Sequence, residues 1–216
     1  MSRRDEILVV AKSQIAEYGY SSTSMRDIAE AAGLLAGSLY SHFKSKAELV
    51  RDIVTRFYDE LLPRQQAVID AGGTGAEQFG EMVSVVFSVC EQHRDELTIL
   101  HYDWHTLSTL DELADVAAQS LETLDRWREV VETGKRDGSM RPNVDTEAMV
   151  RIATSSIHAL IDTVRYSSHP LPPDHSSEHI RVLQEVLLVG ASTRPEAKRT
   201  GSNGRPAKPR AKAAKR

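Results

Sequence analysis

The 216-residue sequence predicts an all-α protein with a small N-terminal helical domain and a larger C-terminal helical domain. Two observations support this fold class. Apolar residues recur at intervals of three and four through almost every segment, which is the spacing of one face of a helix. No stretch shows a convincing alternation of apolar and polar residues, the pattern that is typical of a half-buried strand. Hydrophobic residues make up 40% of the chain, which is enough to build a core.

The first domain is assigned to residues 1–50, and its first helix to residues 4–18. Ile7 and Ile15 fall on one face of this helix, as the periodicity requires. Gly19 follows directly, and glycine readily adopts the left-handed conformation in which many helices end.

Two short helices are expected next. Ser24, with Asp27 three positions later, has the pattern of a capping box at the start of the second helix. Gly33 ends this helix after about two turns. The third helix is expected over residues 36–42, where Leu39 faces the core.

The fourth helix begins after Ser45, a capping residue, and Glu48 is expected to close a second capping box. Pro63 is expected to kink or end this helix, because a proline removes a backbone hydrogen bond and clashes with the preceding turn. Residues 71–75, with the sequence AGGTG, then form a hinge-like stretch.

The second domain is assigned to residues 51–192, and residues 193–216 to a tail. The further helices of the second domain are expected at residues 76–92, 94–107, 110–136, 146–167 and 176–190. The tail is rich in Pro, Gly, Lys and Arg and lacks large apolar residues, so it cannot build a core and is predicted to be disordered.

Composition excludes several classes of protein. No run of about 18 apolar residues occurs, so no membrane span is expected. The single cysteine, Cys90, rules out a disulfide framework within the chain and favours a reducing cytoplasm. No phosphate-binding loop, nucleophile elbow or dinucleotide fingerprint is present, so we expect no enzyme, no catalytic residues and no cofactor.

The net charge of −4 hides a strong asymmetry. The tail from Arg194 onward carries nine Lys or Arg residues and one acid, a net charge of +8, which leaves −12 on residues 1–193. Acidic and basic residues balance within residues 1–50, so the acidic excess lies between residues 51 and 193. Such a region repels nucleic acid, and any DNA contact must involve one end of the chain.

Two short helices joined by a glycine-containing turn are typical of a helix-turn-helix, in which the second helix points its N-terminal end into the major groove. Small side chains at Ala36, Gly37 and Ser38 allow the backbone to approach DNA closely. The expected DNA contacts are Thr23, Ser24, Arg26, Ala36, Gly37, Ser38, Tyr40, His42 and Lys46. Most would contact phosphates, and Arg26 is the candidate for reading a guanine. The alternative is a generic three-helix bundle with a solvated Tyr/His face.

The string TSMRDIAEAAGLLAGSLYSHFKSKAEL closely resembles the DNA-binding signature of the tetracycline-repressor (TetR) family of bacterial transcription regulators. The match covers about residues 5–55, and Gly33, Tyr40 and Lys46 are among the positions that fit the family pattern. The sequence departs from the pattern at Leu34–Leu35, where polar residues are common, which leaves the base preference open.

The resemblance implies a homodimeric repressor that binds a palindromic operator and is released from it by a small-molecule effector. The effector would bind between helices of the second domain, and the last two helices would form the dimer. The expected dimer residues are Ser156, Ile157, Leu160, Leu183, Val186 and Leu187. The alternative is that these helix faces pack only within one chain.

The segment HRDELTILHYDWHTL is the densest candidate for effector contacts. His101 and His105 lie four residues apart and share a helix face, but a metal site needs a third ligand that the sequence does not reveal, and no metal is predicted. The expected effector contacts are Phe87, His101, Trp104, His105, Trp127 and His158, a mostly apolar set with a few polar groups.

Through the segments LTILHYDWHTL and GSMRPNVDTEAMVRIATSSI, the second domain has a fainter resemblance to members of the family that control fatty-acid or sterol catabolism and respond to acyl-CoA thioesters. Arg126, Arg128 and Arg165 would then meet the phosphates of the ligand. A neutral hydrophobic metabolite is equally compatible.

The sequence thus predicts a ligand-responsive transcriptional repressor. The competing hypothesis is an architectural protein that coats DNA without sequence preference and has no effector. The tail contains Gly204–Arg205–Pro206, part of a minor-groove-binding pattern, and its charge is expected to strengthen DNA binding non-specifically.

Overall fold

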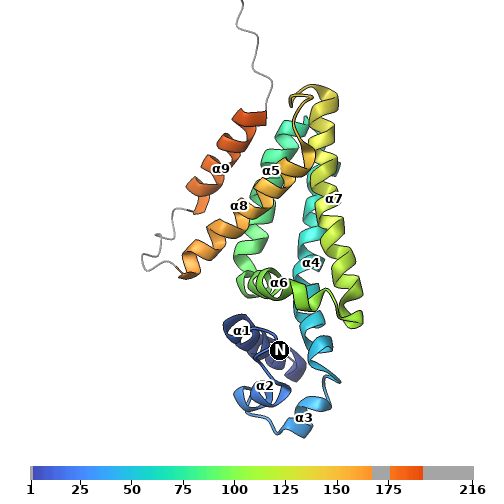
Figure 1. The fold of residues 1–216 in the computed structure, drawn as a ribbon, viewed down its shortest axis with the longest axis vertical. Coiled ribbons are helices and arrows are strands. Elements are labelled where there is room, and N and C mark those ends of the chain that lie inside the picture. The colour runs from blue at the N-terminus through green and yellow to red at the C-terminus, as the bar shows by residue number, and fades with distance from the viewer. Residues whose placement is uncertain (1, 167–175, 192–216) are drawn as a thin grey trace, which may run out of the picture.

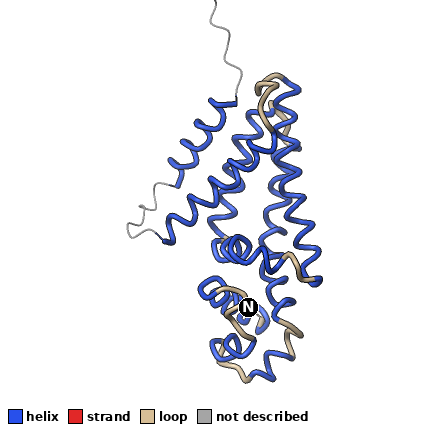
Figure 2. Tube along the Cα trace, viewed as in Figure 1, coloured by secondary structure: helices blue, strands red, loops and turns tan. Residues whose placement is uncertain are grey.

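The computed structural model describes residues 2–166 and 176–191, and within these ranges all regular structure is helical (Figures 1 and 2). The helices are α1 (Arg3–Tyr18), α2 (Met25–Ala31), α3 (Ala36–Tyr40), α4 (Lys46–Asp70), α5 (Gly75–Gln92), α6 (Arg94–Leu107), the short 3-10 helix η1 (Asp111–Leu113), α7 (Ala114–Asp137), α8 (Thr146–Tyr166) and α9 (Ser176–Ala191). The all-α prediction is confirmed. The predicted tail, residues 193–216, lies outside the described residues.

The molecule is elongated, with α1, α2 and α3 at one end and the longer helices α5, α7, α8 and α9 at the other (Figure 1). Helix α4 belongs to both parts. Its first half contributes Leu49 and Ile53 to the packing around α1, and its second half contributes Leu61 and Val68 to the upper core. The buried side chains of the two parts form one continuous hydrophobic cluster. No described helix is long and apolar enough to span a bilayer.

The helix starts follow the capping pattern that the sequence predicts. Ser24 and Asp27 form a complete capping box on α2, and the Ser45 side chain accepts the Glu48 N–H at 3.0 Å at the start of α4. The second half of the predicted capping box on α4, a hydrogen bond from the Ser45 N–H to the Glu48 carboxylate, is replaced by another contact. The Glu48 carboxylate accepts the backbone N–H of Lys44 at 2.8 Å, which ties the end of the preceding loop to the helix.

The prediction that Pro63 would kink or end the fourth helix was wrong about its end, because α4 continues for seven residues beyond Pro63. Pro63 is exposed, as is Asp59, whose carbonyl loses its intrahelical partner. Water can satisfy a carbonyl on the outer face of a helix, so the missing hydrogen bond costs less there than in a core. The helix also gains burial at Gln65 and Val68 by continuing.

The upper ends of α5 and α7 meet through two glycines. A Cβ on Gly75 would lie 2.0 Å from the backbone nitrogen of Gly134, and a Cβ on Gly134 would clash with the Met140 side chain. The Asp137 carboxylate accepts the Gly75 N–H at 2.7 Å and closes the same junction. Gly75, which we assigned to a hinge-like stretch, is the first residue of α5 and part of this close contact.

Candidate nucleic-acid interface and ligand cavity

Helix α3 lies at the tip of the molecule (Figure 1). Ala36, Gly37 and Ser38 are all exposed at its first turn, and no atom would meet a Cβ added at Gly37. Leu39 is fully buried and anchors the helix from beneath, while the Tyr40 ring is 54% exposed. The structure therefore presents a nearly bare backbone with an aromatic side chain beside it, as the sequence predicts.

The two leucines at the departure from the family pattern have different surroundings. Leu34 packs against the hydrophobic core, whereas Leu35, which directly precedes α3, is 80% exposed. Arg26 and Ser24 are exposed on α2 and its N-terminal cap. The Ser24 hydroxyl donates to the Asp27 carboxylate at 2.6 Å. His42 is half-buried just beyond α3.

Thr23 and Lys46 are placed differently from our expectation of phosphate contacts. Thr23 is buried, and its hydroxyl donates to the Gly19 carbonyl at 2.9 Å. The Lys46 ammonium donates to the carbonyls of Tyr20 and Thr23 and lies 4.0 Å from the centre of the Tyr20 ring. Burial lowers the pKa of Lys46. The Thr23 hydroxyl closes the loop between α1 and α2, and Lys46 holds this loop against the start of α4, so the contacts of both side chains are internal.

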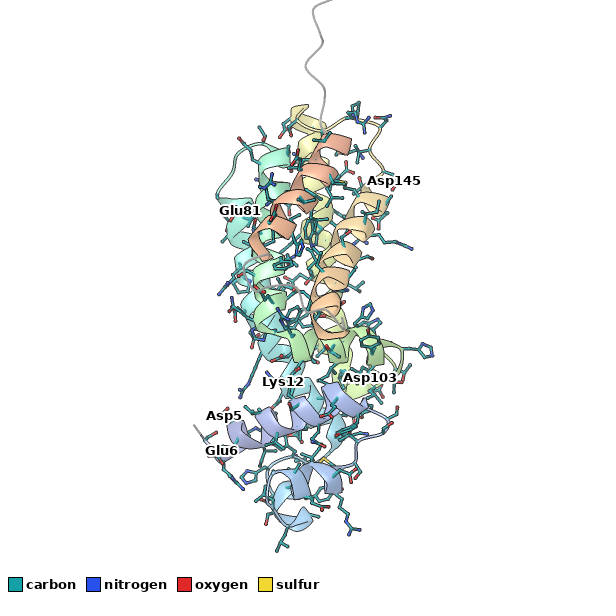
Figure 3. All side chains as sticks on the ribbon, turned by 90° about the vertical axis from the view of Figure 1, so that its left-hand side faces the viewer. Asp5, Glu6, Lys12, Glu81, Asp103 and Asp145 are labelled. Carbon is teal, nitrogen blue, oxygen red and sulfur yellow. The ribbon has the colours of Figure 1, made fainter. Side chains whose placement is uncertain are left out.

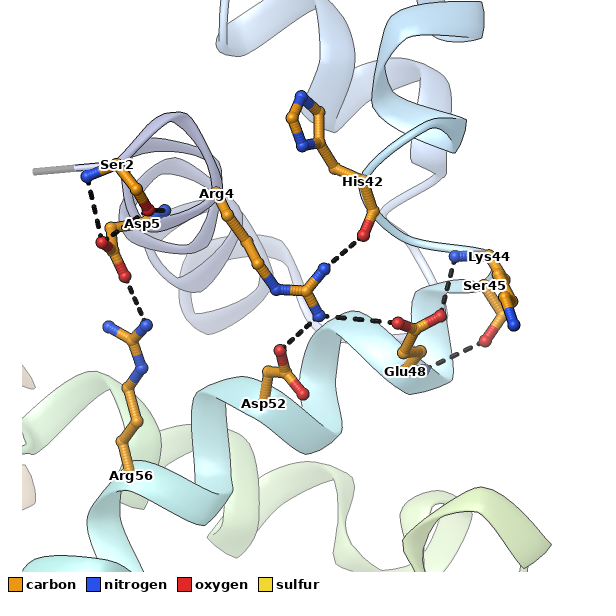
Figure 4. A network of polar contacts seen from close by, with 9 residues as sticks. All are labelled: Ser2, Arg4, Asp5, His42, Lys44, Ser45, Glu48, Asp52 and Arg56. Carbon is orange, nitrogen blue, oxygen red and sulfur yellow. Dashed lines mark hydrogen bonds and ion pairs between the residues drawn. The ribbon is translucent and has the colours of Figure 1, made fainter.

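A polar network that was not predicted from the sequence holds the loop that follows α3 (Figure 4). The Arg4 guanidinium donates to the His42 carbonyl and to the Asp52 carboxylate, the latter at 2.6 Å. It also lies 4.0 Å from the centre of the Phe43 ring. The hydrogen bond to Asp52 raises the pKa of Arg4. One arginine of α1 thus connects the loop after α3 to the second turn of α4.

The second domain contains a cavity of about 270 Å³ among α4, α5, α6, α7 and α8. Four of the predicted effector contacts line it, namely His101, Trp104, Trp127 and His158. Two do not. Phe87 is buried in the core beside Val86, which faces the cavity in its place, and His105 is exposed one turn further along α6.

The cavity has an exposed rim and a buried end. His101 is exposed and His158 is half-buried, and their rings meet edge to face with centroids 5.3 Å apart at the rim. Trp127 lies fully buried at the other end, against Phe79 with centroids 5.3 Å apart. No group of three metal-binding side chains is found in the part of the chain that the structure describes.

Sequence reasoning missed several lining residues because they come from different helices. Tyr58 and Leu61 belong to α4, Ser120 to α7 and Thr154 to α8. Burial raises the pKa of Tyr58 to about 12 and that of Cys90, which also lines the cavity, to about 12. Both groups therefore stay neutral at physiological pH, and the wall is uncharged at these positions.

Helix α6 separates the cavity from the N-terminal domain formed by α1, α2, α3 and the start of α4, which we call the tip domain. Leu97, Leu100 and Trp104 on one side of α6 line the cavity. On the other side, the Glu96 carboxylate accepts the Lys12 ammonium at 2.9 Å and the Asp103 carboxylate accepts the Tyr20 N–H at 2.9 Å. Figure 3 shows Lys12 and Asp103 at the junction of the two domains. One helix thus lines the cavity and also contacts the candidate DNA-binding domain.

Comparison with known proteins agrees with both features. Residues 7–53 match the family model of bacterial regulatory proteins of the tetR family, and residues 72–162 match that of the tetracyclin repressor-like C-terminal domain. The chain is 34% identical over 150 residues to the HTH-type transcriptional repressor KstR2 of Mycolicibacterium smegmatis. The matched segment covers 69% of this chain and 73% of the relative. The chain belongs to the TetR family.

Solved structures share the fold of this TetR-family chain. The ketosteroid transcriptional regulator KstR2 of Mycobacterium tuberculosis superposes with a TM-score of 0.79 and 27% identity, covering 89% of this chain and 96% of that one. AibR, in complex with isovaleryl coenzyme A and operator DNA, superposes with a TM-score of 0.73 over 87% of this chain and 98% of that one. AibR is only 19% identical, so it shows a likeness of fold. The expectation of a DNA-binding transcriptional regulator is confirmed by family membership.

In this TetR-family structure, α8 and α9 form an apolar groove on the outside of the second domain. The groove is lined by Ser156, Ala159, Leu160, His179, Val182, Leu183 and Val186, which include four of the predicted dimer residues. The other two face inward. Ile157 is fully buried and lines the cavity, and Leu187 is 7% exposed, so both already pack within their own chain.

Two of the three arginines considered for a CoA ligand form ion pairs within the chain, although the buried Nη1 of Arg126 has no partner among the described residues. Arg128 forms ion pairs with Glu147 at 2.6 Å and Asp125 at 2.7 Å, and Arg126 pairs with Glu122 at 2.8 Å. The side chain of Arg165 lies outside the described residues.

Proposed function

We propose that this TetR-family regulator is a homodimeric repressor that leaves a palindromic operator when a small, largely apolar molecule occupies the cavity of the second domain. The observation that carries the proposal is the double role of α6. One side of this helix lines the cavity and the other makes the Lys12–Glu96 and Tyr20–Asp103 contacts with the tip domain.

The tip of each protomer is proposed to enter a major groove with the first turn of α3. Ala36, Gly37 and Ser38 allow close approach, and Arg26 is proposed to contact base edges from α2. Ser24, Tyr40 and His42 are proposed to contact phosphates, which would set the register of the protein on DNA. Thr23 and Lys46 are reassigned to a positioning role, since their polar groups are engaged within the domain.

Dimerisation is proposed to occur through the α8–α9 groove. Val186 and Val189 are 65% and 69% exposed on α9, and Ile152 is 53% exposed on α8. Pairing these faces about a two-fold axis would bury them in a four-helix seam. The two tips would then have to sit about 34–36 Å apart to meet successive major grooves of a palindrome.

Release from DNA is proposed to follow from displacement of α6. A ligand shifts a conformational equilibrium only by its differential affinity for the two states. A ligand that fits better when α6 is displaced would move Glu96 and Asp103, and α1 with them. The spacing of the two tips would then no longer match the operator.

The chemistry of the wall supports an uncharged effector, or the uncharged part of a larger one. The similar structure named as a ketosteroid transcriptional regulator makes a hydrophobic metabolite the natural class to test first. An acyl-CoA is the alternative. Its CoA portion exceeds a cavity of about 270 Å³ and would have to leave past His101 and His158 at the rim.

The experiment that tests the function is selection of binding sites from random DNA, followed by footprinting at fixed salt. A discrete two-fold symmetric site is expected. Uniform coating of DNA would instead favour the architectural alternative and overturn the proposal.

Gly37→Trp supplies the matched test of the interface. The Gly37 Cβ position is open, so folding should be kept while the indole holds the backbone away from the groove. Operator affinity is expected to fall at least a hundred-fold, and Gly37→Ala, which adds one methyl group in the same open space, should bind far better than the tryptophan variant. Undiminished operator binding by a folded Gly37→Trp dimer would remove α3 from the interface.

A further inference from the structure

The buried end of the cavity contains a hydrogen-bond donor that lacks a partner in the described part of the chain. Trp127 lines the cavity and is fully buried, and its indole Nε1 contacts no acceptor there. An indole N–H can only donate a hydrogen bond. A buried donor without an acceptor costs free energy, so such a group calls for an explanation.

Three other polar side chains of the wall already have partners. The Thr154 hydroxyl donates to the Val150 carbonyl at 3.0 Å, and the Thr123 hydroxyl donates to the Gln119 carbonyl at 3.2 Å. The Tyr58 hydroxyl is hydrogen-bonded to Ser120. The indole of Trp127 differs from these groups in having no acceptor among the described residues.

A second unpartnered side chain lies at the same level. Gln65 is fully buried, and neither its carboxamide oxygen nor its nitrogen has a partner among the described residues. The next residues along each helix, Gln66 of α4 and Arg126 of α7, are joined by a hydrogen bond of 3.4 Å. This contact places residues 65 and 127 at about the same height along α4 and α7. Gln65 is not itself a lining residue, but it lies one turn beyond the lining residue Leu61.

We propose that the buried end of the cavity recognises a carbonyl oxygen of the effector, which accepts the Trp127 N–H, with the Gln65 amide as a second donor. The inference rests on the proposed function of the cavity and adds the ligand class, an apolar ketone or a similar uncharged carbonyl compound. A carbonyl oxygen is a good acceptor that, unlike a carboxylate, brings no charge next to the neutral Tyr58 and Cys90 and, unlike a hydroxyl, brings no donor that itself needs a partner. The apolar body of the ligand would then lie against Leu61 and Ile157, with its other end toward His101 at the rim.

Two probes of the same shape test the proposal. Benzophenone and 1,1-diphenylethylene differ only in that a C=O group replaces a C=CH₂ group. The ketone is expected to bind about ten-fold more tightly in calorimetry, the effect of one hydrogen bond to an otherwise unsatisfied buried donor. In ¹H–¹⁵N spectra of indole-labelled protein, the ketone alone should shift the Trp127 indole proton downfield.

Variants separate the hydrogen bond from packing. In Trp127→Phe the ratio of the two affinities is expected to fall to about one, and the hydrocarbon serves as an internal reference for any loss of packing. Trp104→Phe, at a lining position nearer the rim, should keep the ratio of about ten. Gln65→Leu should lower the ratio in part and leave the free-state indole signal of Trp127 in place.

Three results would overturn the inference. Equal affinities in the native chain would show that the indole does not reach the oxygen, or that a retained water satisfies it. An indole signal that is already hydrogen-bonded in the free protein and is lost in Gln65→Leu would show that the two side chains satisfy each other. If neither probe binds or raises the melting temperature, the cavity accepts no ligand of this size, and the proposed function fails with the inference.

Discussion

At the scale of single residues, Arg4 joins parts of the tip domain that are distant in sequence. Its guanidinium contacts the carbonyl of His42 just after α3 and the carboxylate of Asp52 in α4. Since α3 has only five residues, its own hydrogen bonds do little to fix its direction. The position of the recognition helix therefore depends on side chains outside it.

We predict that Arg4→Met lowers operator affinity about five-fold, the order of one partly exposed charged hydrogen bond of about 1 kcal/mol. The methionine keeps the apolar stem and removes the contact with His42. Affinity is measured by fluorescence anisotropy at fixed salt. Arg128→Met, which removes ion pairs with Glu147 and Asp125 in the second domain, is the control and should bind normally. Equal binding by both variants would show that Arg4 does not position α3.

The same residues show what sequence reasoning can and cannot predict about a site. Ala36, Gly37 and Ser38 were predicted correctly as exposed, because their exposure follows from the helical period around buried Leu39. Thr23 and Lys46 were expected to face outward. Their inward contacts depend on how the loop between α1 and α2 meets the start of α4, which is a tertiary feature.

At the scale of helices, periodicity and capping predicted every described α-helix, because both signals are local, but they did not predict the 3-10 helix η1. Two details were decided by tertiary context. Helix α4 continues past Pro63 because that residue faces solvent, and α7 is preceded by η1, where Leu113 is held in the core.

The cavity could be predicted only in part. Its lining comes from five helices, and sequence spacing does not show which face of each one converges with the others.

Helix α6 is the element through which we expect the cavity and the tip domain to communicate. We predict that Asp103→Ala, which removes the acceptor of the Tyr20 N–H, reduces the effect of a bound effector on operator affinity several-fold. Effector affinity in the absence of DNA should change little, since Asp103 is not part of the cavity wall.

The measurement for this variant is operator affinity with and without effector. By linkage, the same loss of coupling must appear when effector affinity is measured with and without operator. Asp111→Ala is the control, because Asp111 lies in η1 and has no described contact with α1. Full coupling in Asp103→Ala would exclude this contact as the route.

At the scale of the whole molecule, many carboxylates are stabilised in the folded state by helix N-termini or by partners of opposite charge. The hydrogen bonds of Ser24 lower the pKa of Asp27, those of Thr74 lower the pKa of Glu77, and the hydrogen bond to Arg56 lowers the pKa of Asp5. A carboxyl group with a lowered folded pKa contributes stability above its unfolded pKa, and this stability is lost as the pH falls through the folded value.

We therefore predict that the melting temperature is nearly constant from pH 7 to about pH 5 and falls below the ordinary pKa values of 4.5 for Glu77 and 3.8 for Asp27. The check is calorimetry across this range, with Glu77→Gln as a variant that should lower stability at pH 7 and lose less of it in acid. A melting temperature that rises on acidification would contradict the prediction.

The charge distribution of the chain leads to a last prediction, which concerns the segment from residue 194 to residue 216. Its nine basic residues follow a body with a net charge of −12, and only the tip domain of that body is free of the acidic excess. A cationic segment that reaches phosphates releases counterions, and each contact steepens the dependence of log affinity on log salt by about 0.9.

Deletion of residues 194–216 is expected to flatten this salt dependence by several units and to weaken binding at low salt, while the selected operator sequence stays the same. A variant with all nine basic residues of the segment replaced by glutamine keeps its length and should behave like the deletion, which assigns the effect to charge. An unchanged slope would exclude the segment from DNA binding. A changed operator would mean that it reads bases in the minor groove, and base recognition would then no longer belong to α2 and α3 alone.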